Sequence, residues 1–198
     1  MSLSRRSVMI AGPGLLAARP VRADDLIFKG WRLDLSAMKR PLTADEIASL
    51  PAQIDILEHI EIKPQIRTFF HSVPCQVQEH VEGTGDYQSS GKLMVLTAEP
   101  QSPNNPVLLH ELAHAYHDQM LPLGFQNLDV QRFFRLARVR GDFPAGSYMY
   151  ANPGEFFAMC VSVRLWGVAA RPPSTRELLR AKLPEFYAWI GEAFQGRG

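Results

Sequence analysis

Two histidines four positions apart, His110 and His114, place the strongest constraint on how this chain folds. Residues at that spacing share one side of an α-helix, about 40° apart around its axis and roughly 6 Å apart along it. The surrounding segment Val107–Met120 carries its apolar residues, Leu112 and Tyr116 among them, on the opposite side. This pattern predicts a helix that packs on a core and turns both imidazoles away from it. Asn105 and Pro106 precede the segment and suit its capping and first positions.

Two imidazoles at this helical spacing can bind one zinc ion. Glu111 lies about 100° around the helix from His110, too far to join the ligands, but near enough to reach a water held by the metal. Zinc lowers the pKa of such a water, and a carboxylate can take its proton. We therefore predict zinc as the cofactor, His110 and His114 as ligands and Glu111 as the general base. An accidental pair of surface or core histidines is the alternative.

A third ligand is needed, and no histidine follows His117 in the chain. Glu155 is the best candidate, in the first turn of a helix that Asn152-Pro153 opens. Ala158 lies on the same face and is small, which would let two helices approach closely around the ion. The alternative is a first-turn carboxylate that the helix dipole favours.

The remaining histidines and cysteines are weaker candidates. His117 shares a face with the two predicted ligands and could be a fourth ligand, a hydrogen-bond donor behind the ligands or a half-exposed residue. We rank the ligand role last, because one straight helix cannot easily aim three imidazoles at one ion. Cys160 lies about 140° around its helix from Glu155 and is excluded as a ligand. The dispersed His59, His71 and His80 are expected to be structural or surface residues.

Taken together, these motifs resemble a known group of enzymes. His110-Glu111-x-x-His114 followed by Glu155-Phe156-Phe157-Ala158 is similar to the gluzincin metallopeptidases, and more narrowly to the catalytic domain of anthrax lethal factor and its bacterial relatives. The resemblance covers Gly91 to about Gly167, and it departs from several relatives at His117, where they have an aspartate. It implies a zincin-like metallopeptidase fold, hydrolysis of peptide bonds and a peptide or protein substrate.

The same relatives have a tyrosine seven residues before the glutamate ligand, and Tyr148 stands at that distance from Glu155. The resemblance implies that its hydroxyl stabilises the negative charge that gathers on the carbonyl oxygen when water attacks. Tyr150 is the rival for this role, and a core aromatic residue is the alternative for either tyrosine.

Helical periodicity and turn residues together predict an α+β fold, mainly helical, with a small sheet preceding the metal helix. A capping box at Thr43 opens a helix that Pro51 is expected to interrupt. Gly91–Ala98 is expected to flank the cleft and to pair with an extended peptide. The other expected elements are a strand at Cys75–Val81, a turn at Gly83–Asp86, helices at Asn127–Arg140 and Asn152–Gly167, and a helix opened by a second capping box at Ser174 and broken or kinked at Pro184.

The net charge of +1 gives no reason to expect a nucleic-acid or anionic partner. Arg132, Arg135, Arg138 and Arg140 form a local basic cluster on one predicted helix. We interpret this cluster as a solvated face, with a subsite for an acidic or extended substrate as the alternative.

The first residues have the pattern of an export signal. Arg5 and Arg6 precede a short apolar run at Val8–Ala18, and Val21-Arg22-Ala23 suits a signal peptidase. The paired arginines also resemble the twin-arginine motif. We expect residues 1–23 to be removed and residues 24–198 to form one metallopeptidase domain in the periplasm or outside the cell, without stable membrane insertion.

Two further questions stay open at this stage. Cys75 and Cys160 could form one disulfide in an oxidising compartment or remain two separate buried thiols. A non-catalytic zinc-binding or interaction protein on the same fold is the alternative function. A di-metal oxidase would need its Glu-x-x-His motif twice, and Glu111-x-x-His114 occurs once.

Overall fold

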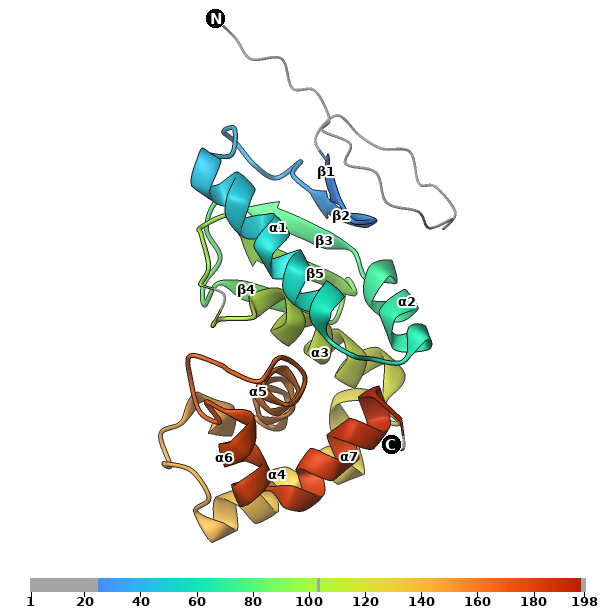
Figure 1. The fold of residues 1–198 in the computed structure, drawn as a ribbon, viewed down its shortest axis with the longest axis vertical. Coiled ribbons are helices and arrows are strands. Elements are labelled where there is room, and N and C mark those ends of the chain that lie inside the picture. The colour runs from blue at the N-terminus through green and yellow to red at the C-terminus, as the bar shows by residue number, and fades with distance from the viewer. Residues whose placement is uncertain (1–24, 103, 197–198) are drawn as a thin grey trace, which may run out of the picture.

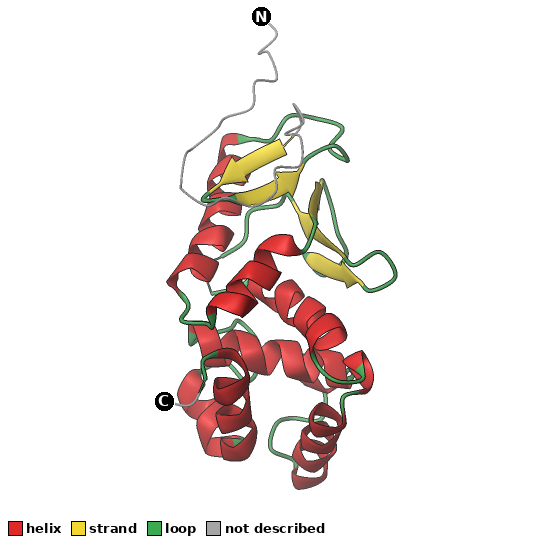
Figure 2. Cartoon of the chain, turned by 90° about the vertical axis from the view of Figure 1, so that its right-hand side faces the viewer, coloured by secondary structure: helices red, strands yellow, loops and turns green. Residues whose placement is uncertain are grey.

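The computed structural model describes residues 25–102 and 104–196 and so leaves the expected export signal, residues 1–23, outside. A five-stranded sheet lies at one end of the molecule and most helices at the other (Figures 1 and 2). The strands are β1 (Asp25–Phe28), β2 (Trp31–Asp34), β3 (Cys75–Gln78), β4 (Gly85–Gln88) and β5 (Leu93–Thr97). The helices are α1 (Ala44–His59), α2 (Pro64–Ser72), α3 (Val107–Met120), α4 (Leu128–Arg140), α5 (Pro153–Trp166), α6 (Arg176–Lys182) and α7 (Pro184–Phe194), with 3-10 turns η1 (Gly124–Gln126) and η2 (Tyr148–Tyr150).

The sheet has the strand order β1-β2-β3-β5-β4. Strands β2, β3 and β5 run parallel, whereas β1 and β4 are antiparallel to their neighbours at the two edges. Strand β5 therefore has a hydrogen-bonded partner on each side, Gln76 facing Val95 on one and Asp86 facing Val95 on the other. Strand β4 is the edge strand that packs against α3, and within the described residues no strand pairs with its outer edge.

Helix α3 lies between the sheet and the C-terminal helices and packs against both (Figure 1). Leu108 and Leu112 are fully buried on its apolar side, and α5 packs on α3, with Phe157 of α5 against His117 of α3. The predicted α+β fold is confirmed, with the small sheet ahead of α3. Within the described residues, no helix is long and apolar enough to cross a membrane.

Two sequence-based expectations about local structure were wrong. Helix α1 continues through Pro51. The proline removes one intrahelical hydrogen bond, but the burial of Leu50, Ile54 and Leu57 in the core outweighs that loss. The expected turn at Gly83–Asp86 ends early, and Gly85 already begins β4.

Other helix boundaries follow the expected signals. Gly141 and Gly167 end α4 and α5 in the left-handed conformation that glycine adopts most easily. Pro184 separates α6 from α7, as the sequence predicts. The N-cap of α6 is Thr175 rather than Ser174, since the Thr175 hydroxyl accepts the hydrogen bond from the Leu178 amide.

The predicted capping box at the start of α1 is present and carries an additional ion pair. The Glu46 carboxylate accepts a 2.7 Å hydrogen bond from the Thr43 amide, and Arg40 donates to both its oxygens at 2.8 and 2.6 Å. The Arg40 hydrogen bond outweighs burial and lowers the pKa of Glu46 from 4.5 to about 2.

We expect this carboxylate to make the fold sensitive to acid. Because the pKa of Glu46 is lower in the folded state, its stabilisation is complete above about pH 4.5 and is lost as the pH falls toward about 2. The Glu46→Gln variant should therefore melt at a lower temperature than the wild type at neutral pH, and the gap should narrow in acid. Thermal denaturation from pH 7 to pH 3 measures this gap, and a gap that stays constant would contradict the assignment.

Candidate metal centre and active site

Three of the predicted site residues meet where α3 crosses α5. The Nε2 atoms of His110 and His114 lie 3.1 Å apart. Glu155 places one carboxylate oxygen 3.1 Å from His110 Nε2 and the other 3.5 Å from His114 Nε2. In the part of the chain that the structure describes, these three side chains form the group with metal-binding geometry, and their donor atoms all lie within 4.8 Å of one another. We call His110, His114 and Glu155 the metal group.

The spacing and chemistry of these donors fit a zinc ion. Ligands about 2.0–2.1 Å from a tetrahedral zinc lie about 3.4 Å from one another, close to the separations seen here. Burial on its own raises the pKa of Glu155, but hydrogen bonds from His110 and His114 outweigh it and hold that pKa well below its usual range. The carboxyl is therefore ionised, as a metal ligand must be.

The first turn of α5 is built to bring Glu155 against α3. The Asn152 side chain caps the helix by accepting a 2.9 Å hydrogen bond from the Glu155 amide. A Cβ added at Gly154 would lie 3.6 Å from the His114 ring and only 3.0 Å from the Asn152 side-chain oxygen. Glycine at this position thus leaves room for the Asn152 cap, while a Cβ would make only an ordinary van der Waals contact with His114.

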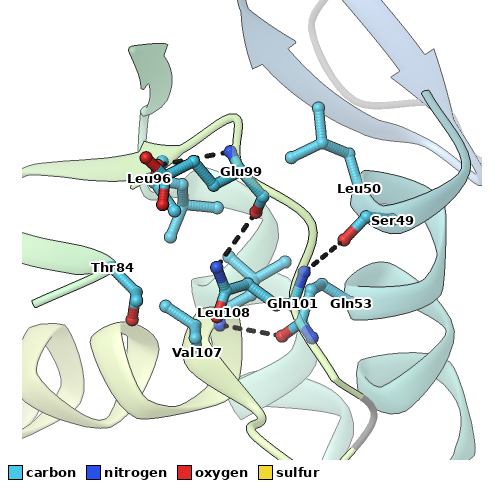
Figure 3. Close-up of a pocket in the computed structure, with 10 residues that line it drawn as sticks. Ser49, Leu50, Gln53, Thr84, Leu96, Glu99, Gln101, Val107 and Leu108 are labelled. Atoms are coloured by element: carbon cyan, nitrogen blue, oxygen red, sulfur yellow. Dashed lines mark hydrogen bonds between the residues drawn. The ribbon is translucent and has the colours of Figure 1, made fainter. Parts of the chain in front are cut away.

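The start of α3 is fixed by a residue from another helix. Gln53 of α1 accepts a 3.3 Å hydrogen bond from the Leu108 amide and donates a 3.2 Å bond to the Asn105 carbonyl. Figure 3 shows Gln53 lying beside Leu108 at this helix end. The expectation that Asn105 caps α3 was wrong, because Pro106 is the N-cap residue and the long-range partner Gln53 satisfies the free amide.

Glu111 is buried beside the metal group, with 5 % of its surface exposed. Burial raises the pKa of its carboxyl to about 7, and the nearby charges of Glu155 and Asp86 act in the same direction. The electrostatic effect of His114 and a hydrogen bond from the Tyr87 backbone lower the pKa of Glu111 and oppose this shift only in part. A carboxyl with a pKa near neutrality can both take and return a proton at physiological pH.

Strand β4 lies directly against Glu111. A Cβ added at Gly85 would come within 2.8 Å of Val107 Cγ1 and 2.9 Å of Glu111 Cγ and Oε1. The strand is tied to α3, since the Tyr87 hydroxyl donates a 2.8 Å hydrogen bond to Asp118, and Lys92 also pairs with that carboxylate. This contact could not be predicted from the sequence, because Gly83-Thr84-Gly85-Asp86 is typical of a turn rather than of the start of a strand.

A cleft of about 900 Å³ opens over the metal group. The expectation that Gly91–Ala98 flanks the cleft and pairs with an extended peptide was wrong. Both edges of β5, the strand in this segment, are already paired, and β4 lines the cleft instead. The lining combines the predicted site residues with the β4 segment and the start of α5: Val81, Glu82, Gly83, Gly85, Asp86, Tyr87, His110, Glu111, His114, Phe125, Gln126, Gln131, Tyr148, Asn152, Pro153, Gly154 and Glu155.

The two candidate tyrosines have different surroundings. Tyr148 lines the cleft, as Glu155 does, and is 43 % exposed. Burial and the Glu155 carboxylate raise its pKa to about 12, so its hydroxyl keeps its proton. Tyr150 is buried, and its hydroxyl donates a 3.0 Å hydrogen bond to the Ala137 carbonyl. Of the two tyrosines, Tyr148 therefore faces the cleft and Tyr150 the core.

His117 matches none of the three roles that the sequence left open. It is fully buried, with its ring centroid 4.7 Å from Phe157 and 5.1 Å from Phe125. Neither ring nitrogen has a hydrogen-bond partner, and burial lowers its pKa to about 4, so the ring is neutral. It packs here as an aromatic residue behind the ligands.

The remaining side chains lie outside the site. Cys75 and Cys160 are buried free thiols. The four arginines of α4 are exposed and do not line the cleft, in keeping with a solvated face. Among the other histidines, His71 stacks 4.1 Å from Trp31, whereas His59 and His80 are exposed.

Comparison with known proteins places the fold. No protein-family model matches the chain, and no curated protein matches it in sequence. The solved structure of the PRO-PRO endopeptidase PPEP-2 from Paenibacillus alvei matches it with a TM-score of 0.56 at 18% sequence identity, covering 82% of this chain and 96% of that one. This likeness shows that the two chains share a fold, while the resemblance to gluzincins and lethal factor stays a prediction.

Proposed function

We propose that this chain is a zinc metalloendopeptidase of the gluzincin type. The observation that carries the proposal is the gathering of two imidazole nitrogens and a carboxylate, 3.1 to 3.5 Å apart, beside the buried Glu111 in an open cleft. The shared fold with an endopeptidase supports the same conclusion. A structural zinc site would close its fourth position with another side chain, whereas a catalytic site keeps that position open. Zinc-dependent cleavage of peptides by the purified chain tests the proposal.

In this proposal each side chain has a separate task. His110, His114 and Glu155 would hold the zinc ion, which when bound polarises the scissile carbonyl and makes a water easier to deprotonate. Glu111 takes a proton from the attacking water, and its pKa of about 7 allows it to pass that proton to the leaving amine. Tyr148 donates its hydroxyl hydrogen to the carbonyl oxygen as negative charge develops there.

Strand β4 would align the substrate. It is an edge strand that lines the cleft, so an extended peptide can add to it by backbone hydrogen bonds and present its scissile bond to the metal group. We therefore propose an extended segment of a peptide or protein as substrate. Peptides with Pro–Pro bonds belong among those tested, because the PPEP-2 neighbour is named a PRO-PRO endopeptidase.

Export is part of the proposal and rests on the sequence alone. Residues 1–23 would direct the chain to the periplasm or the outside of the cell, and residues 24–198 would form the mature peptidase. Sequencing the N-terminus of the exported form tests this, with Asp24 expected as its first residue.

Tyr148→Phe is expected to lower kcat by about a hundredfold, which corresponds to about 3 kcal/mol for one lost oxyanion donor. The ring stays, so zinc content and melting temperature should not change. Tyr150→Phe is the matched control, since it loses a buried hydrogen bond to Ala137 and should lose stability rather than kcat. Steady-state kinetics of both variants measure kcat, and unchanged kcat in Tyr148→Phe would exclude its role as the oxyanion donor.

Gly85→Ala is expected to lower kcat at least tenfold while zinc content stays the same. Its Cβ would need the space that Glu111 Cγ and Oε1 occupy, so the general base must move. Gly146→Ala is the control, because a Cβ there meets nothing within 4 Å. Equal activity of the Gly85→Ala and Gly146→Ala proteins would show that β4 does not position Glu111.

A further inference from the structure

One charged side chain covers the ring of Tyr148. The guanidinium of Arg171 lies over it, 4.8 Å from the ring centroid. Tyr148 is nearly half exposed and lies on a 3-10 turn that lines the cleft. Arg171 is therefore the neighbour best placed to orient this ring.

The hydroxyl and the ring face of Tyr148 would have separate tasks in the proposed reaction. A phenol has a single hydrogen to donate. In the proposed function that hydrogen points to the carbonyl oxygen of the bound peptide. The contact between the Tyr148 ring face and Arg171 does not use the hydroxyl, so it can remain throughout.

Arg171 is presented by a short hairpin between α5 and α6. Val168 and Thr175 form a β-bridge, and the Ala169 amide donates a 3.0 Å hydrogen bond to the Ser174 carbonyl. At the base of the hairpin the Arg176 side chain donates to the carbonyls of Arg164 and Leu165, at 3.1 and 3.0 Å. These bonds fix the hairpin to the C-terminal end of α5, the helix that carries Glu155.

Within the described residues, Arg171 forms no ion pair with a carboxylate, and its guanidinium contacts the Tyr148 ring. A cation held over an aromatic face at this distance is attracted to the π-electrons of the ring. We propose that Arg171 is a positioning residue that holds the Tyr148 ring over the metal group during the reaction. This inference rests on the proposed peptidase function and adds a residue that no sequence motif indicates.

The kinetic test compares Arg171→Gln with Arg132→Gln, a control that also removes an exposed arginine lying over an aromatic ring, 4.2 Å from the Phe133 centroid. Arg171→Gln should lower kcat about fivefold, with KM and zinc content unchanged, and Arg171→Lys should recover part of the loss. Arg132→Gln should match the wild type. In the Tyr148→Phe background, Arg171→Gln should have no further effect on kcat, because the hydroxyl that it positions is gone.

A spectroscopic measurement reads the ring position without relying on activity. With 3-fluorotyrosine incorporated, the Tyr148 resonance is the one missing from Tyr148→Phe, and it should shift in Arg171→Gln but not in Arg132→Gln. An unchanged resonance, full kcat in Arg171→Gln, or an equal loss in the Tyr148→Phe background would each overturn the positioning role. If the zinc-loaded wild type cleaves no peptide, it is the proposed function that fails, and the inference that rests on it fails too.

Discussion

Glu111→Gln is expected to lower peptide cleavage by roughly 10² to 10⁴-fold, the usual contribution of a general base. The amide keeps the shape of the side chain but cannot accept a proton from water. Zinc should be retained in full, because the three donor atoms belong to His110, His114 and Glu155. Kinetics on one peptide substrate together with elemental analysis of the same samples give both results.

The controls for this variant separate chemistry from folding. Glu61→Gln changes an exposed carboxylate in the loop between α1 and α2 and should cleave at the wild-type rate. Glu111→Gln should melt at or above the wild-type temperature, because it replaces a buried ionisable group by a neutral one. A Glu111→Gln enzyme with near wild-type kcat would show that another group takes the proton.

Replacing His110 and His114 together by alanine should abolish both zinc retention and cleavage. One carboxylate, Glu155, would remain of the three donors, which is too few to hold a zinc ion in dilute solution. The matched control is the double alanine variant at His59 and His80, which removes two exposed histidines that lie outside the metal group. Elemental analysis after dialysis against a weak chelator measures retention. Full zinc in the first variant would place the site elsewhere.

The parts of the fold that sequence could predict are those governed by local chemistry. The bounds of α3 follow from the helical period of its apolar residues, and the start of α5 follows from the Asn152 cap and Pro153. Glu155 could be proposed as a ligand because the first turn of a helix fixes where its side chain points. In the structure Glu155 lies beside His110 and His114, the two histidines that the sequence had already indicated as ligands of one ion.

The parts that sequence could not predict depend on contacts between distant segments. Gln53 caps α3 from 55 residues away, and nothing near Leu108 indicates it. Gly85 reads as a turn residue until α3 is seen to pack against it. His117 shares the ligand face of its helix, yet Phe125 and Phe157 enclose it, so its neighbours and not its periodicity determine its environment.

Zinc-dependent cleavage of a broad peptide library tests the central claim most directly. Residues 24–198 would be stripped with a chelator, reloaded with zinc and incubated with a library that includes Pro–Pro sequences, and the products identified by mass spectrometry. We expect internal cleavage by the zinc-loaded wild type that disappears on stripping, returns with zinc and is absent from Glu111→Gln. If the zinc-loaded wild type produces no more cleavage than Glu111→Gln, this chain is not a metallopeptidase.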